Sequence, residues 1–296
     1  MAAMPTAPSN GTEICYEEIG DPADPTLLLV SGLGSQLVSW DPEFCSGLAG
    51  RGFRVVRFDN RDVGRSTRFT ERVDVMGLFR ARATGAAMPP VPYLLSDMAA
   101  DAVGLLDHLG ADRAHVAGAS MGGMIAQTMA IEHPGRLLSL TSIMSTTGET
   151  DVGLATPEAM QALLSPPPTT RDEYQDAALR MAGVWGSPGL YDVDRLRRMA
   201  GEAWDRGYDP SGTARQLAAI TASGSRADAL ATLAVPTLVI HGTADTLVQP
   251  SGGERTAELV PDAKLLVIEG MAHDLAPPLW PTVIDALAAH AGEHAA

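Results

Sequence analysis

The sequence has few residues that could cross-link the chain or anchor it in a membrane. Only two of its 296 residues are cysteines, Cys15 and Cys45, and neither belongs to a C-x-x-C or His-Cys cluster. This pattern excludes a disulfide framework and a structural zinc site. No apolar run reaches the roughly 18 residues of a membrane span. Met1 to Thr12 also lack the basic and apolar regions of a secretory signal, so we expect a soluble, cytoplasmic protein.

Positive charge is also scarce. The chain has 21 Lys and Arg against 36 Asp and Glu, a net charge of −15, and Lys264 is its only lysine. Nucleic acids and anionic membranes bind clustered cations, so we expect neither as a partner. The 45% of hydrophobic and 19% of charged residues are typical of a globular protein. The length allows one large core with an appendage, or two domains of similar size.

Short apolar runs alternate with stretches of helical periodicity. This alternation is typical of a mainly parallel sheet that helices cover on both faces. Between the runs, apolar residues from Met98 to Leu109 recur at helical spacing and predict a helix that ends at Gly110. A second helix is expected to begin after Ser120 and to end at Pro134. Six runs are predicted to be strands, at residues 26–30, 53–58, 114–117, 137–144, 236–240 and 264–268.

The alternation stops between residues 146 and 232. Amphipathic stripes at 174–185 and 193–204 indicate helices there, and no run in this stretch is convincing as a strand. We therefore predict a helical cap, or lid, at residues 146–232, inserted into a core made of 1–145 and 233–296. A second irregular segment, 68–92, is too long for a simple connection between a strand and a helix, and such a segment is either functional or mobile.

The sequence Gly118-Ala119-Ser120-Met121-Gly122 follows a predicted strand and precedes a predicted helix. This is the G-x-S-x-G pattern in the strand–turn–helix context of a nucleophile elbow. The glycines remove side chains that would collide with neighbouring backbone, and the helix N-terminus favours developing negative charge. Ser120 is therefore the candidate nucleophile. The spacing does not fit the G-x-G-x-x-G of a dinucleotide site.

A serine hydroxyl needs a base to take its proton and an acid to orient that base. Asp245 follows the predicted strand 236–240, and His273 follows the last one, 264–268. Both are expected at the sheet edge from which Ser120 emerges. We predict that His273 is the base and Asp245 the acid.

Other histidines and acids were weighed for the same roles. His115 lies inside a strand, His133 precedes a proline, and His241 is only four residues from the candidate acid. The remaining histidines, on a helix or near the C-terminus, are His108, His290 and His294. Asp274 is adjacent to the candidate base and would need an awkward geometry, while Glu149 and Asp151 remain alternatives for the acid.

Two backbone N–H groups are predicted to stabilise the oxyanion. One belongs to Met121, directly after the candidate nucleophile. The other belongs to Leu33 in Ser31-Gly32-Leu33-Gly34, where flanking glycines allow a sharp turn. No cluster of metal ligands occurs in the sequence, and we expect neither a metal nor another cofactor.

Four motifs are spread over nearly the whole length of the chain, at 118–123, 59–66, 236–242 with Asp245, and 270–273. On these motifs the chain resembles the α/β-hydrolase superfamily. The resemblance implies a mainly parallel eight-stranded sheet with helices on both faces, a helical cap after strand 6, and a triad of Ser120, Asp245 and His273. Ser31 departs from the pattern, because many members have histidine there.

Within the superfamily the chain resembles the capped branch of serine esterases, lipases and cofactor-free haloperoxidases. Residues 20–25 and 61–66 are similar to bacterial methylesterases that act on aromatic polyketides. Epoxide hydrolases and haloalkane dehalogenases differ, since they use aspartate as nucleophile. The resemblance implies hydrolysis of a small, mostly apolar carboxylic ester.

Several functions stay open at this point. Perhydrolysis, C–C bond hydrolysis and lactone hydrolysis use the same triad, and fold alone does not separate them. A non-catalytic ligand-binding module is a further alternative, which the complete triad disfavours. Met160, Trp185 and Trp204 are candidate pocket walls, although packing within the cap is the role that we favour for them.

Overall fold

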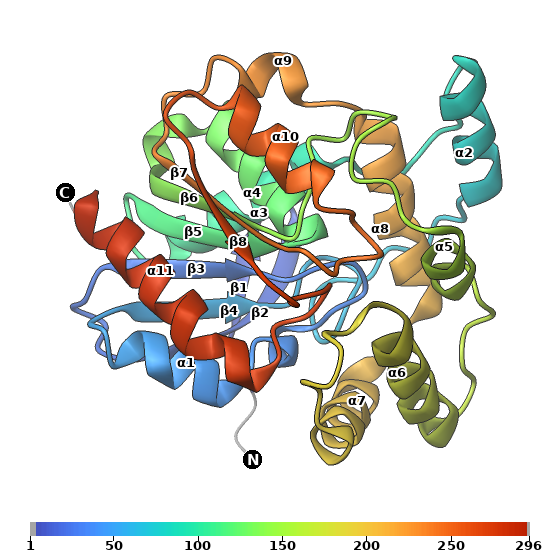
Figure 1. Cartoon of the computed structure of the whole chain (residues 1–296), viewed down its shortest axis with the longest axis horizontal. Coiled ribbons are helices and arrows are strands. Elements are labelled where there is room, and N and C mark those ends of the chain that lie inside the picture. Colours follow the sequence, from blue (N-terminus) through green and yellow to red (C-terminus); the bar gives the residue numbers. More distant parts are fainter. Residues whose placement is uncertain (1–3, 295–296) are drawn as a thin grey trace.

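The computed structural model describes residues 4–294. Its centre is a single eight-stranded sheet in the order β1-β2-β4-β3-β5-β6-β7-β8 (Figure 1). β1 pairs antiparallel with β2, and β2 pairs antiparallel with β4. The other six strands, β3 to β8, are parallel to one another. This confirms the predicted fold class. The strands are β1 (Thr6–Ser9), β2 (Thr12–Ile19), β3 (Thr26–Val30), β4 (Arg54–Phe58), β5 (Ala114–Ala119), β6 (Leu137–Ile143), β7 (Thr237–Gly242) and β8 (Lys264–Ile268).

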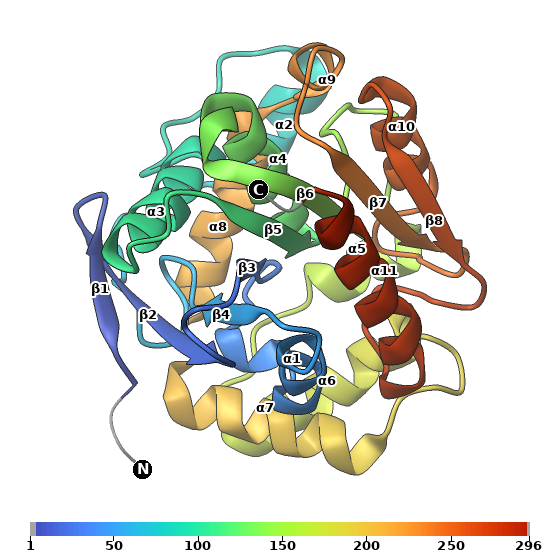
Figure 2. The ribbon, with the colours of Figure 1, turned by 90° about the vertical axis from the view of Figure 1, so that its left-hand side faces the viewer.

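Helices cover both faces of this sheet (Figure 2). On β3, Leu27 and Leu29 pack with one set of helices, whereas Leu28 and Val30 pack with the other. Side chains alternate between the two faces of a strand, so burial of both faces explains the continuous apolar run. One face carries α1 (Pro42–Ala49) and α11 (Trp280–Glu293), and the other carries α3 (Leu95–His108), α4 (Met121–Glu132), α9 (Ala227–Leu230) and α10 (Ser251–Leu259). Three short 3₁₀ helices span Leu37–Ser39, Pro134–Arg136 and Pro277–Leu279.

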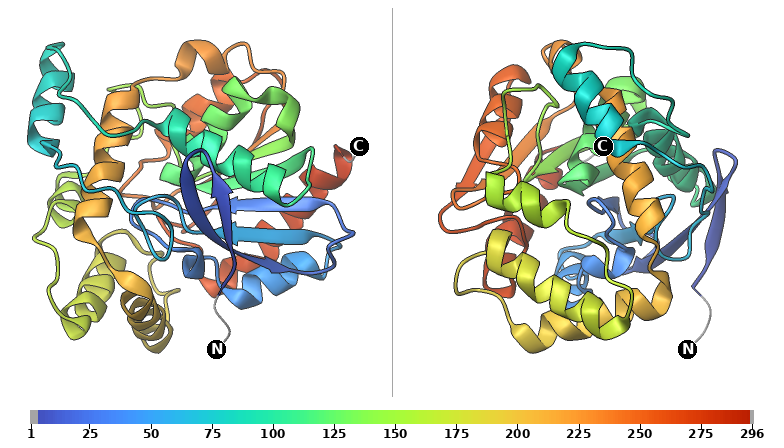
Figure 3. Two further views of the ribbon diagram at one scale, coloured as in Figure 1. Left: turned by 180° about the vertical axis from the view of Figure 1, so that it is seen from behind. Right: turned by 90° about the vertical axis from the view of Figure 1, so that its right-hand side faces the viewer.

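Three helices that follow β6 form an insertion, which we define as residues 171–223. They are α6 (Arg171–Trp185), α7 (Val193–Gly207) and α8 (Pro210–Ser223). The side chains of Thr170, Asp192 and Asp209 accept hydrogen bonds from the first-turn N–H groups and so define where each helix begins. α8 contacts both α2 (Val75–Thr84) and α3, and it therefore lies between α2 and the core (Figure 3). A short helix, α5 (Pro157–Leu163), precedes the insertion.

All six predicted strands are present, with ends that differ by at most two residues. The hairpin of β1 and β2 was not among them, because acidic residues interrupt the apolar pattern of β2. A local signal does exist, since Asn10 and Gly11 both have positive φ, 46° and 75°, as in the tight turn that an Asn-Gly pair favours. The segment 68–92 contains α2, in which only Leu78 and Ala81 are buried, so its periodicity is faint. No helix within residues 4–294 is long and apolar enough to cross a bilayer.

Candidate active site

Ser120 occupies the sharp turn between β5 and α4. Its φ of 57° and ψ of −121° lie outside the usual regions for a residue with a side chain, a strain that costs about 1–3 kcal/mol. A Cβ atom on Gly118 would overlap the backbone of Gly122, and one on Gly122 would overlap the carbonyl of Val30. The close packing of β3, β5 and α4 therefore requires both glycines.

The three predicted triad residues lie within hydrogen-bonding distance of one another. His273 Nε2 is 2.9 Å from Ser120 Oγ, and His273 Nδ1 is 2.7 Å from Asp245 Oδ2. These residues come from loops after β5, β7 and β8, and parallel strands bring such loops to one sheet edge. A carboxylate only accepts, so it fixes the proton on Nδ1 and leaves Nε2 as an acceptor toward the serine.

Asp245 is held rigidly and remains charged. Its Oδ1 accepts the N–H groups of Leu247 and Val248, both at 2.9 Å, which directs Oδ2 to the imidazole. Burial raises the pKa of this carboxyl. The charge of His273 and the hydrogen bonds from His241, His273 and Val248 outweigh that effect and lower the pKa of Asp245 to about 2.

His241 is a second imidazole beside the same carboxylate. Its Nε2 lies 2.8 Å from the Val248 carbonyl and 3.4 Å from Asp245 Oδ2. Because Nε2 faces these two acceptors, it carries the ring proton. His241 thus supports Asp245 and does not reach Ser120 as a base.

The alternative residues have other partners. Glu149 pairs with Arg255 at 3.1 Å, and Asp274 accepts the N–H of Ser187 at 3.1 Å. His115 is buried in β5, with Nδ1 2.9 Å from Ser139 Oγ. Asp151 is exposed in the loop after β6, and the remaining alternatives are on or at the ends of helices: His108 ends α3, His133 follows α4, and His290 and His294 lie in and just after α11.

The predicted oxyanion segment, residues 31–34, passes directly beside Ser120. We call the loop that contains it, residues 31–37, the oxyanion loop. A Cβ atom on Gly32 would lie 3.3 Å from Ser120 Cβ. The loop turns at Gly34, whose φ is 66°, and the Ser35 N–H closes this turn on the Gly32 carbonyl at 3.1 Å. No hydrogen bond within residues 4–294 uses the N–H of Leu33 or of Met121. Both donors are therefore available to a ligand oxygen.

Three buried side chains hold the oxyanion loop in place. Asn60 donates to the Ser31 carbonyl at 3.0 Å, and Asp59 accepts the Leu37 N–H at 2.7 Å. Both belong to the motif 59–66, so this motif supports the loop. The third is Gln216 of α8, which accepts the Gly34 N–H at 2.8 Å. Nothing in the local sequence around Gln216 indicates this contact, because it depends on how the insertion docks.

The insertion also contacts the loop of His273. The Trp185 carbonyl accepts the His273 N–H at 2.8 Å, and Ser187 Oγ accepts the Ala272 N–H at 2.9 Å. The Ser187 hydroxyl in turn donates to Asp274. Ser187 is completely buried and was not among the predicted site residues. The end of α6 and the residues after it thus hold the backbone just before the candidate base and the side chain of Asp274 just after it.

The large side chains proposed as pocket walls differ in their packing and exposure. Trp204 packs within the insertion, with its ring 5.4 Å from that of Tyr208 and 5.9 Å from that of Tyr174. Met160, on α5, is 37% exposed. For Trp204 the contacts fit the packing role.

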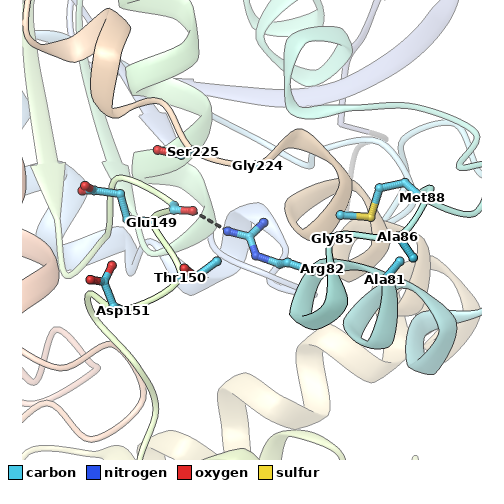
Figure 4. A pocket seen from close by; sticks show the side chains of 11 residues that line it. Ala81, Arg82, Gly85, Ala86, Met88, Glu149, Thr150, Asp151, Gly224 and Ser225 are labelled. Carbon is cyan, nitrogen blue, oxygen red and sulfur yellow. Dashed lines mark hydrogen bonds between the residues drawn. The ribbon is translucent and has the colours of Figure 1, made fainter.

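A cavity of about 390 Å³ lies between α2 and the loop after β6 (Figure 4). Arg82 of α2 reaches across it and donates to the carbonyl of Gly148 and, at 2.9 Å, to that of Thr221. Glu149, Asp151 and Met88 also line it, whereas Ser120, Asp245 and His273 do not. The segment 68–92 therefore contributes to this cavity.

Comparison with known proteins identifies the fold family. The family described as alpha/beta hydrolase fold matches residues 25–276. The rhodomycin D methylesterase DauP from Streptomyces sp. (strain C5) is 30% identical over 313 residues, which cover 97% of this chain and 98% of DauP.

Two solved structures support the same fold. The enol-lactonase from Burkholderia xenovorans LB400 has a TM-score of 0.73 at 24% identity, covering 97% of this chain and 99% of that one. The meta-cleavage product hydrolase CumD from Pseudomonas fluorescens IP01 has a TM-score of 0.76 at 19% identity, covering 98% and 97%. The chain belongs to the α/β-hydrolase fold family.

Proposed function

We propose that the protein is a serine hydrolase that cleaves a carboxylic ester through an acyl-enzyme intermediate. The observation that carries this proposal is the hydrogen-bonded series Ser120–His273–Asp245, with distances of 2.9 and 2.7 Å. Such a series activates a hydroxyl that is otherwise a weak nucleophile.

In the proposed first half-reaction, His273 Nε2 takes the Ser120 proton while Oγ attacks the ester carbonyl. The N–H groups of Leu33 and Met121 hold the resulting oxyanion. The intermediate collapses as the imidazolium gives its proton to the departing alkoxide, which leaves as an alcohol. Asp245, charged at neutral pH, stabilises the imidazolium and keeps the ring in the required orientation.

In the second half-reaction, His273 accepts a proton from water as the water attacks the acyl group. The same two N–H groups hold the second oxyanion. Collapse of this intermediate returns the proton to Ser120 and releases the carboxylic acid. Each step uses only this chain's own residues and water.

We further propose that the substrate is a methyl ester of a mostly apolar small molecule. The 30% identity to a rhodomycin D methylesterase over 97% of this chain supports this choice. The net charge of −15 suits an uncharged substrate. We also propose that residues 146–232 form a cap over the site and that 1–145 and 233–296 form the core.

The test is hydrolysis of a panel of methyl, longer alkyl and aryl esters by the wild-type protein and by Ser120→Ala. The variant is expected to lose at least about 1,000-fold in kcat, since removal of a triad member leaves only binding and oxyanion effects. A lactone and a C–C hydrolase substrate in the panel separate the other chemistries. Equal turnover by the two proteins, or no ester turnover by either, would contradict the proposal.

A fluorophosphonate reports the nucleophile independently of the natural substrate. We expect it to label Ser120, as mapped by peptide mass spectrometry. The matched control is Ser225→Ala, because Ser225 lines the separate cavity in Figure 4 and not the triad. This control should keep both activity and labelling.

A further inference from the structure

We propose that Gln216, on α8 of the insertion, is a positioning residue for the oxyanion loop. This inference rests on the proposed function. The Gln216 side chain is completely buried. Its Oε1 accepts the Gly34 N–H at 2.8 Å, and its Nε2 donates to the Arg61 carbonyl at 2.8 Å. Only this orientation of the amide satisfies both partners, because the reverse would set donor against donor and acceptor against acceptor.

The bond to Gly34 fixes a peptide that the turn itself leaves unpaired. Within the turn the hydrogen bond runs from the Ser35 N–H to the Gly32 carbonyl, so the Gly34 N–H needs an outside acceptor. The preceding peptide in the chain, between Gly32 and Leu33, carries the candidate oxyanion donor. Gln216 therefore acts one peptide away from the N–H that would contact the substrate oxygen.

The side chain of Thr213 adds a packing contact from the same helix. A Cβ atom on Gly34 would lie 2.9 Å from Thr213 Oγ1 and 3.1 Å from Thr213 Cγ2. Thr213 and Gln216 are three residues apart on α8, and residues at this spacing lie on one face of a helix. Thr213 on this face packs against the turn, and the Gln216 amide hydrogen-bonds to the backbone of the turn.

α8 is firmly anchored where it makes these contacts. A Cβ atom on Gly212 would overlap the Asp62 carbonyl, so the helix touches the backbone of the core there. Arg215, next to Gln216, forms a two-point ion pair with Asp62 at 2.9 and 2.8 Å, and both residues are at most 3% exposed. An anchored helix presents the Gln216 amide in one position, as a positioning residue requires.

At the other end of the loop, Asn60 holds the Ser31 carbonyl, but the Ser31 side chain adds no support. The Ser31 hydroxyl is buried with no hydrogen-bond partner among residues 4–294. Side-chain support from position 31 is thus lacking, and Gln216 holds the turn from the insertion.

The direct test is Gln216→Met, which keeps the length of the side chain and removes both hydrogen bonds. A displacement of about 1 Å in a reacting geometry can lower a rate about 100-fold. We expect kcat for an ester to fall about 10- to 100-fold while KM stays within about twofold, because oxyanion contacts strengthen in the transition state. Affinity for an alkyl boronic acid, whose adduct with Ser120 mimics the tetrahedral intermediate, should fall by the same factor as kcat/KM.

The matched control is Arg195→Met. Arg195 also joins the insertion to the core, through an ion pair with Asp41 and a contact 4.5 Å from the Trp280 ring, but it does not touch the oxyanion loop. This variant should keep kcat within about twofold of the wild type. Gln216→Glu keeps an acceptor for the Gly34 N–H but sets a second acceptor against the Arg61 carbonyl, so it should recover only part of the activity that Gln216→Met loses.

The outcomes separate this inference from the proposed function. If the wild type hydrolyses esters and Gln216→Met lowers only the melting temperature, with kcat and boronate affinity unchanged, Gln216 has a purely structural role and the inference fails alone. If the wild type neither hydrolyses esters nor labels at Ser120, the proposed function fails and the inference fails with it. Should Gln216→Met not fold, Thr213→Ala replaces it. A kcat about 3- to 10-fold below wild type supports the inference, and an unchanged kcat overturns it.

Discussion

Each oxygen atom of the Asp245 carboxylate makes a different set of contacts in the site. Oδ1 shapes its own loop through the N–H groups of Leu247 and Val248, and Oδ2 contacts His273. The same side chain therefore links the backbone of the β7 loop to the orientation of the candidate base.

Replacement of Asp245 by Asn tests the contact between Oδ2 and His273 alone. The Asn carbonyl oxygen can keep the two backbone bonds, which leaves its NH₂ facing His273 Nδ1. The ring must then carry its proton on Nε2, where it cannot accept from Ser120, and we expect kcat to fall about 10,000-fold. Ester kinetics measure this loss, and circular dichroism should show an unchanged fold. An unaffected rate would contradict the assignment of Asp245 as the acid.

At the scale of the elements, the candidate triad lies on loops that follow parallel strands, and the insertion contacts two of the loops that form the site. The end of α6 and the residues after it contact the His273 loop through Trp185 and Ser187. α8 contacts the oxyanion loop through Gln216. The insertion is thus hydrogen-bonded to the two loops on which the proposed chemistry depends.

Ser187→Ala tests the contact at the His273 loop. The substitution leaves the Ala272 N–H and the Asp274 carboxylate without the hydroxyl, and a lost hydrogen bond to a charged group costs about 1.5–3 kcal/mol. We expect kcat/KM for an ester to fall roughly tenfold or more, because the backbone before His273 and the side chain of Asp274 after it both lose a partner. The exposed Ser211 of the same insertion provides the control, and Ser211→Ala should behave as the wild type. Equal kinetics for Ser187→Ala and Ser211→Ala would exclude a role for this contact in catalysis.

At the scale of the whole molecule, two histidines are buried, one in the sheet and one in a helix that covers it. His115 lies in the central strand β5 and His290 in α11, and both are at most 4% exposed. Burial, together with the charges of His290 and His294, lowers the pKa of His115 to about 4. Burial likewise lowers the pKa of His290, with His294 and Lys264 adding to the effect and backbone contacts opposing it.

These shifts predict that the protein loses stability in mild acid. Between the unfolded pKa near 6.5 and the folded pKa near 4, the unfolded chain binds more protons at His115 than the folded protein does. The free energy of unfolding therefore decreases as the pH falls through this window, by up to about 3 kcal/mol for His115.

Urea unfolding at pH 7 and at pH 4.5 measures this loss. His115→Gln should show a smaller difference between the two pH values than the wild type. The control His108→Gln, at an exposed position at the end of α3, should match the wild type. The same pH dependence in all three proteins would contradict the contribution of His115.

The residues closest to the proposed chemistry could be predicted from the sequence because their signals are local. The steric demand of the elbow is confined to Gly118–Gly122, and the two loops with Asp245 and His273 each follow an apolar strand. The hairpin of β1 and β2 and the helix α2 were harder to recognise, because edge elements bury only part of their side chains and show weak periodicity.

The sequence by itself determined the six parallel strands, the elbow turn and the candidate triad, since short segments carry the apolar patterns and glycines on which these depend. Only the tertiary structure decided which side chains support the site. Gln216 and Gly34 are 182 residues apart in the chain, and Ser187 and Ala272 are 85 apart. Such contacts form only when the insertion docks on the core, and their strength comes from burial that no local pattern encodes.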